Sequence, residues 1–423
     1  MCLGLKSLKI ILITIKKEKD YTVKVLMLGW ELPPHNSGGL GVASYNICRS
    51  LSKSNIDIEF IVPYDSPHNI DFMKVTPATS IDVTSITRSS IAYDSYKYIN
   101  SDGSEQLLNI YDQQSIYELS VIKLVEDKDF DILHAHDWLT FRAAIRIKEL
   151  KKIPIILHVH SVESDRAGSK NGNPLVQEIE YLALSMADHI VAVSNRTKDK
   201  IIEDYNIPAD KIEVIHNSIN FDDIEPISDQ TAHTYLACLK QNGYKIITSI
   251  GRITIQKGLP NLLHALQEVI RRNPKTILLI QGSGEQYNEL LGLSADLGIG
   301  ANVLFTEFQR GKNLRDSLAI GNLFVMPSIS EPFGLTALEA IGYGTPVLIS
   351  KQSGVSEIIN HCLKINFWDI KEMINQIHGL INNPALEVEL LNNSKQELVN
   401  LSWDSSADKI KNLYHKKLLE VST

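Results

Sequence analysis

The fold of this chain is decided by one stretch, residues Lys245–Gly282, which reads "KIITSIGRITIQKGLPNLLHALQEVIRRNPKTILLIQG". Short aliphatic runs, "KIITSIG" and "TILLIQG", stand at its ends and predict strands, and the sequence between them predicts a helix that begins near Pro260. Proline suits the first helical turn, because the N–H group that it lacks would have no helical acceptor there. A strand, a helix and a second strand this apolar are typical of a parallel sheet with helices on both faces.

The same alternation continues in both directions. Towards the C-terminus it predicts the strands "NVLFTEF", "LFVMPS" and "PVLIS", followed by a mostly helical tail from Asn375 to Glu420. Towards the N-terminus it predicts the strands "VKVLML", "IEFIV", "DILHA", "PIILHVH", "HIVAVS" and "IEVIH". Residues Pro63 to Gln114 are rich in Ser, Thr, Asp and Tyr, and we interpret them as an irregular insertion with weak strands.

The length of the chain and one polar segment indicate its domain organisation. Its 423 residues suffice for two domains with separate cores, and the acidic stretch 220–244 is the best candidate for a connection between them. We predict an N-terminal extension at 1–22, a first domain at 23–220, a linker at 221–243, a second domain at 244–400 and a C-terminal helix at 401–423. The two α/β domains are expected to face each other across a central cleft, where the carboxyl ends of the strands bind ligands.

Composition limits the partners of the protein. A net charge of −8 gives no general case for nucleic acid or an anionic membrane, and the apolar run Leu8–Ile15 is too short to span a bilayer. The four cysteines (Cys2, Cys48, Cys238 and Cys362) are scattered and suit free core thiols in a reducing compartment. We therefore expect a cytoplasmic protein without a membrane span, and its oligomeric state is left open.

The stretch "SGGLGVASYN" predicts the start of the first helix. Gly38, Gly39 and Gly41 allow the backbone to approach an anion closely, and the free N–H groups of a helix start favour negative charge. A dinucleotide fingerprint would need a tight turn after the strand, but eight residues, Trp30–Ser37, intervene. A glycine-rich turn without a ligand is the alternative.

Two predicted strands end in paired histidines, "LHAHDW" and "LHVHS". Side chains two apart on a strand point to the same face, so the four rings could form a metal site with Asp137 nearby. The alternative is that they have structural roles or contact a substrate. The four residues are His134, His136, His158 and His160.

Charged residues follow two other strands. Arg252 and Lys257 lie on the loop between a strand and a helix, where two cations could neutralise a diphosphate, although a solvated basic loop would look the same. In "SISEPFGLTALEA", Glu331 falls on the loop after "LFVMPS", and Glu339 lies on the following helix. The pattern Thr336-x-x-Glu339 is that of a capping box, which would give Glu339 a purely structural role. Otherwise both carboxylates could accept hydrogen bonds from sugar hydroxyls.

Taken together, these stretches resemble a retaining glycosyltransferase of family 4, with the GT-B fold of two Rossmann-like domains. The resemblance covers nearly the whole chain from Val23, and its most specific pieces are "EPFGLTALEA", "GRITIQKG", "IQGSGE", "ADHIVAVS" and "KIEVIHNS". Within the family, "ELPPHNSGGLG", "HAHDWLT" and "HVHSVESDR" are most similar to glycogen and starch synthases and their relatives that extend α-glucans.

The resemblance implies a role for each matched position. Two cations would hold the donor diphosphate, one glutamate the nucleotide ribose, and the other glutamate, with nearby backbone amides, the donor hexose. In full, it implies catalytic roles for His160, Arg252, Lys257 and Glu331, an acceptor-side role for Asp137, and donor-binding roles for Gly38, Gly39, Gly251, Phe333, Gly334, Leu335 and Glu339.

Our hypothesis is transfer of glucose from ADP- or UDP-glucose to an α-glucan, with retention of configuration and without a metal cofactor. Within the family, the alternative is transfer of another sugar to a lipid-linked or cell-envelope glycan. From other classes come a metal-dependent hydrolase that uses the four histidines, and a nicotinamide-dependent oxidoreductase, which the glycine spacing disfavours. A nucleotide-sugar binding protein without turnover is a further alternative, against which the Arg, Lys and Glu residues argue.

Overall fold

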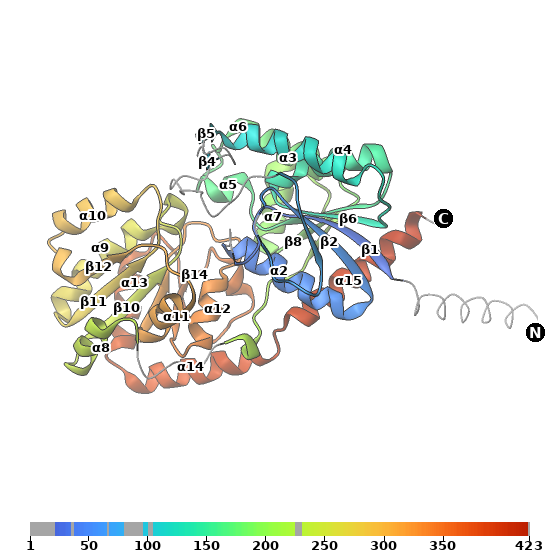
Figure 1. The fold of residues 1–423 in the computed structure, drawn as a ribbon. Helices are drawn as coiled ribbons and strands as arrows, with labels where there is room; N and C mark the ends of the chain where they lie inside the picture. The colour runs from blue at the N-terminus through green and yellow to red at the C-terminus, as the bar shows by residue number, and fades with distance from the viewer. Residues whose placement is uncertain are drawn as a thin grey trace, which may run out of the picture.

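A computed structural model describes residues 22–34, 38–65, 67–79, 96–99, 105–224 and 231–421. The predicted N-terminal extension and Cys2 lie outside these ranges, except for Thr22. Two parallel sheets form the body of the molecule, and helices cover both faces of each sheet (Figure 1). The predicted α/β architecture with two sheets is therefore confirmed.

The first sheet has seven strands in the order β3-β2-β1-β6-β7-β8-β9. All six strands that the sequence predicts here are present, and a seventh, β3, comes from the segment interpreted as an irregular insertion with weak strands. Their bounds are β1 Val23–Leu28, β2 Ile56–Val62, β3 Lys74–Pro77, β6 Ile132–His136, β7 Ile155–Val159, β8 His189–Ala192 and β9 Ile212–Val214. A small antiparallel pair, β4 Tyr96–Ile99 and β5 Glu105–Leu108, stands apart from this sheet.

The second sheet has six strands in the order β12-β11-β10-β13-β14-β15. In the stretch that decides the fold, β10 leads into α9 Leu259–Arg272, which begins one residue before Pro260 and returns the chain to β11. The strand bounds are β10 Lys245–Ile250, β11 Thr276–Gln281, β12 Val303–Thr306, β13 Leu323–Met326, β14 Val347–Ser350 and β15 Leu363–Ile365. The sequence did not predict β15, which is only three residues long.

Helices pack on the first sheet from both sides. One face is covered by α3 Ile110–Val125, α4 Trp138–Lys151, α6 Pro174–Met186 and α7 Asn195–Tyr205, and the other by α2 Gly39–Leu51 and α15 Trp403–Val421. The last helix, α15, thus returns from the end of the chain to the first domain, where Ile410 and Tyr414 lie in the same core as the strands (Figure 1). Cys48 of α2 is buried in this core as predicted, whereas Cys238 is exposed.

The second sheet has its own helices. They are α9, α10 Tyr287–Asp296, α11 Gly311–Ile320, α12 Leu335–Gly342, α13 Ile370–Ile381 and α14 Pro384–Val399. One further helix, α8 Thr234–Gln241, falls in the stretch interpreted as a connection, but its Leu236 packs against Ile246 and Leu279 of the second sheet. Within the described ranges, none of the helices is long and apolar enough to cross a bilayer.

The chain crosses between the domains twice. It leaves the first domain after Asn220 and returns to it at Trp403, whose backbone N–H donates a hydrogen bond to Asn220 Oδ1 at 3.3 Å. The two crossings are therefore in contact with each other.

The packing of α15 predicts that a cavity in this helix destabilises the protein. Ile410 is fully buried, so Ile410→Ala should lower the free energy of unfolding by about 2–5 kcal/mol. The urea midpoint, followed by tryptophan fluorescence, measures this effect. Lys409→Ala, at an exposed position of the same helix, is the control and should shift stability by less than about 0.5 kcal/mol. Equal midpoints for the two variants would contradict the packing.

Candidate active site

Two charged residues predicted on separate loops meet at the carboxyl ends of neighbouring strands. Lys257 lies in the short helix η5 (Ile255–Lys257) after β10, and Glu331 follows β13. Lys257 Nζ donates to Glu331 Oε2, and Ser328 Oγ donates to the same oxygen at 3.1 Å. The Glu331 side chain is only 10% exposed. Its negative charge is therefore stabilised by Lys257 and Ser328. Arg252, also after β10, is exposed and bonds Gln256 Oε1 at 3.3 Å.

The turn that follows Glu331 is fixed by its backbone. Gly334 has a φ of +109°, and a Cβ atom there would lie 2.7 Å from Met326 Cε and 3.3 Å from Glu331 Cγ. Only glycine fits this combination of conformation and crowding. The Glu331 backbone N–H donates to Gln352 O and its carbonyl accepts from Gly354 N, both at 2.9 Å. The turn at Gly334 and these two hydrogen bonds therefore fix the backbone of Glu331, and with it the position of the carboxylate.

The capping-box interpretation of Glu339 is wrong. The helix α12 begins at Leu335, the residue at its cap is Gly334, and no side chain caps it. The left-handed turn at Gly334 moves the helix start, so Glu339 no longer lies at the third position, from which it could reach the cap N–H. Its carboxylate has no hydrogen-bond or ion-pair partner among the described residues, and burial raises its pKa to about 7. A half-buried carboxylate without a partner is a candidate ligand-binding group.

The start of α2, in the first domain, lies next to the start of α12, in the second domain. A Cβ atom at Gly39 would lie 4.0 Å from Leu335 Cδ1, and Leu335 packs against cores of both domains. At the same helix start, the N–H groups of Gly38 and Gly41 donate to Glu31 Oε2 at 2.6 and 3.3 Å. Glu31 is the first residue of the quoted stretch "ELPPHNSGGLG", but the sequence analysis assigned it no role, because its contact with the helix start arises only in the fold. Its carboxylate occupies the position at which negative charge is expected at a helix N-terminus.

Asp137 holds the ends of β6 and β7 together. It has a φ of +57°, and its Oδ1 accepts from the backbone N–H of His160 at 2.6 Å and of Ser161 at 3.3 Å. Burial raises its pKa to about 7, against the opposing effects of Arg166 and of these two N–H groups. The contact that the structure describes is therefore internal to the first domain, and an acceptor-side role for Asp137 stays a prediction.

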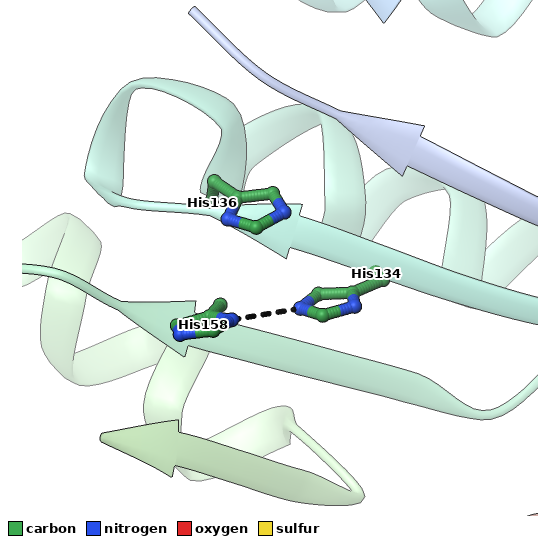
Figure 2. A group of neighbouring side chains, drawn as sticks. All are labelled: His134, His136 and His158. Carbon is green, nitrogen blue, oxygen red and sulfur yellow. Dashed lines mark hydrogen bonds between the residues drawn. The ribbon is translucent and has the colours of Figure 1, made fainter. Parts of the chain in front are cut away.

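The four histidines form a block of two hydrogen-bonded pairs. His134 Nε2 and His158 Nδ1 are 3.3 Å apart with ring planes 8° from parallel (Figure 2). His136 Nδ1 and His160 Nε2 are 3.0 Å apart. Along each strand the rings stack, at centroid distances of 4.7 Å on β6 and 4.4 Å on β7. At one corner, Tyr414 Oη of α15 lies 2.5 Å from His134 Nδ1. We call this arrangement the histidine block.

The histidine block does not fit a shared metal ion in its present geometry. Nitrogen atoms of His134, His136 and His158 lie within 4.8 Å of one another, which is the spacing that suggests a metal site. A metal ion must lie close to the plane of each imidazole that binds it, because the lone pair lies in the ring plane. His136 stacks on His134 with 14° between the planes, so their lone pairs run side by side and do not converge. The metal-dependent alternative therefore lacks geometric support.

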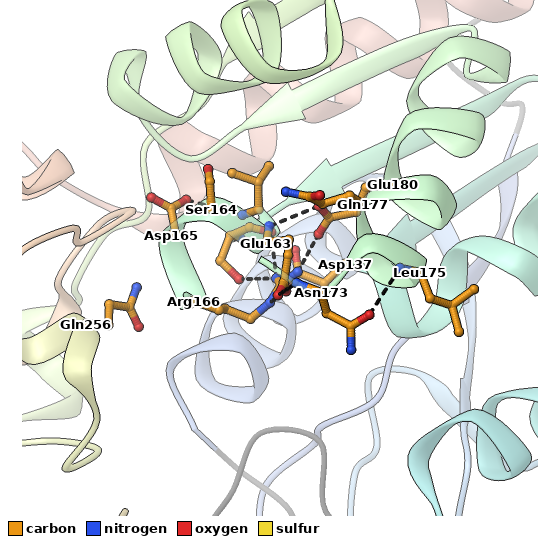
Figure 3. Close-up of polar contacts among 12 residues, drawn as sticks. Asp137, Glu163, Ser164, Asp165, Arg166, Asn173, Leu175, Gln177, Glu180 and Gln256 are labelled. Carbon is orange, nitrogen blue, oxygen red and sulfur yellow. Dashed lines mark hydrogen bonds and ion pairs between the residues drawn. The ribbon is translucent and has the colours of Figure 1, made fainter. Parts of the chain in front are cut away.

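A buried ion network lies beside the block, on residues that the sequence analysis did not select. Arg166 lies between the carboxylates of Glu163 and Glu180, and Gln256 of the second domain is drawn to the left of them in Figure 3. Asp165 Oδ1 accepts from Lys200 Nζ at 3.0 Å and from Ser330 Oγ of the second domain at 2.5 Å. Ser330 directly precedes Glu331, so this bond ties the loop that carries Glu331 to the first domain.

A second tie between the domains involves Glu357. Its carboxylate accepts from the backbone N–H groups of Asn195 and Arg196 at the start of α7, and from His216 Nε2, each at 2.9 Å. Although burial alone would raise it, these hydrogen bonds lower the pKa of Glu357 to about 2. The carboxylate stays charged at neutral pH and holds the two domains in contact.

Two parallel-sheet domains whose strand-end loops meet in this way define the GT-B class of glycosyltransferases. Residues 37–223 match the family model for Glycosyltransferase Family 4, and residues 238–397 match that for glycosyl transferases group 1. The chain belongs to the GT-B glycosyltransferases, with a family 4 domain followed by a group 1 domain. The resemblance to family 4 and to the GT-B fold is thereby confirmed, and retention of configuration stays a prediction.

Two proteins are similar along nearly their whole length. An uncharacterized glycosyltransferase of Methanocaldococcus jannaschii is 29% identical over 406 residues, covering 93% of this chain and 98% of its own. Glycogen synthase of Mycobacterium tuberculosis is 26% identical over 403 residues, covering 93% and 94%.

Solved structures share the fold. Sucrose-phosphate synthase of Thermosynechococcus elongatus superimposes with a TM-score of 0.73 at 18% identity, covering 95% of this chain and all of its own. Anabaena HepE, solved in complex with UDP-glucose, superimposes with a TM-score of 0.69 at 16% identity, covering 93% and 99%. At these identities the comparison establishes the GT-B fold.

The unpartnered carboxylate predicts a gain of stability in Glu339→Gln at pH 8. In the unfolded chain this carboxyl ionises near its ordinary pKa of 4.5, but in the folded chain only near 7. Between these pH values the unfolded state binds fewer protons than the folded state. The free energy of unfolding therefore falls as the pH rises from about 4.5 to 7, and it does not recover above pH 7. Removing the ionisable group should raise the free energy of unfolding at pH 8 by about 1–3 kcal/mol, and change it little at pH 5. Urea midpoints at both pH values measure the difference.

The control for this experiment is Glu389→Gln, at an exposed position of α14, which should give the same small effect at both pH values. An equal stability of Glu339→Gln and the wild-type protein at pH 8 would contradict the raised pKa of Glu339.

Proposed function

We propose that this glycosyltransferase transfers a hexose, glucose in our hypothesis, from ADP- or UDP-glucose to an α-glucan with retention of configuration. The observation that carries the proposal is the pair Lys257 and Glu331 at the carboxyl ends of β10 and β13, beside a helix that bears the unpartnered Glu339. A cation, a fixed carboxylate and a spare carboxylate are the groups that a diphosphate, a hexose and a ribose need.

The donor diphosphate is assigned to the loop after β10. Arg252 is exposed there, and Lys257 has three N–H donors, of which Glu331 takes one, so both cations can meet phosphate oxygens. Gly251 directly follows β10 and, without a side chain, leaves room for the backbone to approach the phosphates. Positive charge at this position stabilises the diphosphate as it leaves. In other enzymes a metal ion stabilises the leaving diphosphate. Here the two cations would do so, and transfer without a metal ion is therefore part of the proposal.

The sugar and the ribose are assigned to the loop and helix after β13. Glu331 and the backbone amides of Phe333, Gly334 and Leu335 would bind hydroxyl groups of the hexose, and Glu339 would accept hydrogen bonds from the ribose diol. Glu339 suits this role because nothing among the described residues competes for its carboxylate. Ribose binding would then provide the hydrogen bonds that offset the cost of ionising a buried carboxyl.

Retention is assigned to a front-face reaction. The acceptor hydroxyl oxygen forms a bond to the anomeric carbon while the bond from that carbon to the diphosphate oxygen breaks, and the hydroxyl proton passes to the leaving phosphate. The contacts of Ser330 with Asp165 and of Glu357 with α7 would keep the domains together and water out during this step.

The comparisons support this choice of substrates. Glycogen synthase of Mycobacterium tuberculosis is similar along nearly the whole chain, and Anabaena HepE, which shares the fold, was solved with UDP-glucose. A transfer assay against a panel of nucleotide sugars, with maltooligosaccharides and glycogen as acceptors, tests donor and acceptor together. Growth of the oligosaccharides with one glucose donor is the expected result. Donor hydrolysis without growth would move the acceptor to another glycan, and no consumption of any donor would overturn the proposal.

Loss of the cation at position 257 should slow turnover strongly. Lys257→Ala removes one charge from the diphosphate site, and removal of a single stabilising group of this kind costs about 10²–10³-fold in kcat. Release of the nucleoside diphosphate in the transfer assay measures turnover, and an unchanged unfolding midpoint would show that the variant folds.

The matched control is Lys371→Ala, at an exposed lysine of α13 in the same domain, which should retain normal turnover. Near-normal turnover of Lys257→Ala would contradict the diphosphate role.

A further inference from the structure

The histidine block determines where its protons lie. Burial lowers the pKa of His136 to about 3 and those of the other three rings well below the ordinary value, so all four rings are neutral at pH 7. A neutral imidazole has one N–H donor and one bare nitrogen, and the hydrogen bond of one nitrogen decides the state of the other. Each pair in the block therefore has a definite donor and a definite acceptor.

His136 has one bonded and one unbonded nitrogen. Its Nδ1 is 3.0 Å from His160 Nε2, whereas its Nε2 is buried without a partner in the described part of the chain, on a ring that faces Phe60. If the proton were on Nε2, a buried N–H donor would stay unsatisfied. If it is on Nδ1, the N–H donates to His160, and only a bare acceptor is left unbonded. Unsatisfied buried N–H groups are the rarer of the two in folded proteins, which favours the second arrangement.

The same reasoning applies independently to the other pair. His158 Nε2 is buried and unbonded, so its proton belongs on Nδ1, which donates to His134 Nε2. The proton of His134 then lies on its Nδ1, 2.5 Å from Tyr414 Oη. One assignment, with each proton on Nδ1, thus accounts for both pairs.

We propose that His136 is a positioning residue that holds His160 in the tautomer with its proton on Nδ1, so that His160 offers a hydrogen-bond donor to the cleft. His160 is 9% exposed while the other three rings are fully buried, and its Nδ1 is bonded to none of the described residues. Its backbone N–H is fixed by Asp137, so the direction of the ring is set from two sides.

For catalysis, this inference rests on the proposed function. An Nδ1–H group at the cleft donates to an oxygen atom of the bound donor sugar and has no lone pair with which to take a proton. His160 therefore orients the transferred sugar and is not the base for the acceptor hydroxyl, whose proton leaves with the diphosphate. The tautomer itself is a property of the folded chain and does not depend on any substrate.

The tautomer is measured by NMR on protein with ¹⁵N-labelled histidine rings. Long-range proton–nitrogen correlation spectra at pH 8 distinguish protonated from bare ring nitrogens, and His160→Gln assigns the His160 signals by their disappearance. The expected result is a protonated Nδ1 and a bare Nε2 for His160. A protonated Nε2 in the wild-type protein would overturn the proposal, whatever the variants do.

Variants at position 136 test whether His136 sets this state. His136→Asp replaces the donor by a carboxylate, which only accepts hydrogen bonds at pH 8, and should move the His160 proton to Nε2. His136→Gln keeps an N–H donor and should preserve the wild-type tautomer. His134→Leu, in the pair that does not bond His160, is the control and should leave the His160 tautomer unchanged. An unchanged tautomer in His136→Asp would remove His136 from the proposal.

Turnover separates this inference from the proposed function. In an active enzyme, His136→Asp should lower kcat at least tenfold with little change in the KM of the donor, whereas His136→Gln should keep most of the wild-type kcat. A normal kcat in His136→Asp with a displaced tautomer would overturn the role of the Nδ1–H group in transfer. If the wild-type protein consumes no nucleotide sugar while its His160 carries the proton on Nδ1, the proposed function fails and the positioning role of His136 stands.

Discussion

A parallel strand can pair with the next one only if the chain first returns to the edge of the sheet at which it started. Crossover helices make this return in both domains, so strand carboxyl ends and helix N-termini gather at one edge of each sheet. Lys257 and Glu331 are 74 residues apart in the sequence and belong to different crossovers, yet this constraint brings them into contact. The direction of the strands therefore sets the position of the candidate site, and the individual contacts act within that position.

The same constraint accounts for the histidine block. Residues two apart on β6 and on β7 point to one face, and the parallel register sets His136 opposite His158. Because the rings stand on the pleat in the same direction, their planes are stacked. Imidazoles that converged from several elements could bind a metal ion, but stacked imidazoles can only bond in pairs across the two strands. The strand geometry thus turns a metal-like residue pattern into a hydrogen-bonded support for His160, the least buried of the four rings.

The sheets were predictable from strong local patterns. Long aliphatic runs such as those of β10 and β11 are stable where both faces of the strand are buried, inside a sheet covered by helices. The short strand β15 has too few residues to give such a pattern. The cap of α12 was predicted wrongly because Thr336 and Glu339 have the spacing of a capping box, while the left-handed turn at Gly334 depends on packing. Glu31 and Asp165 lie within stretches quoted for the resemblance, but neither was given a role. Their roles depend on contacts made in the fold, and the domain-bridging partner of Asp165, Ser330, lies 165 residues away.

The C-terminal helix has a consequence for motion. The chain crosses between the domains at Asn220 and again at Trp403, and these two points are bonded to each other. Any opening that separates Leu335 from Gly39 must pivot where the crossings touch. Since α15 is packed into the core of the first domain, it travels with that domain, although it follows the second domain in the sequence. A spectroscopic label on α15 therefore belongs to the same rigid body as one on β1, and a pair that reports on opening needs its second label on the sheet that contains β10.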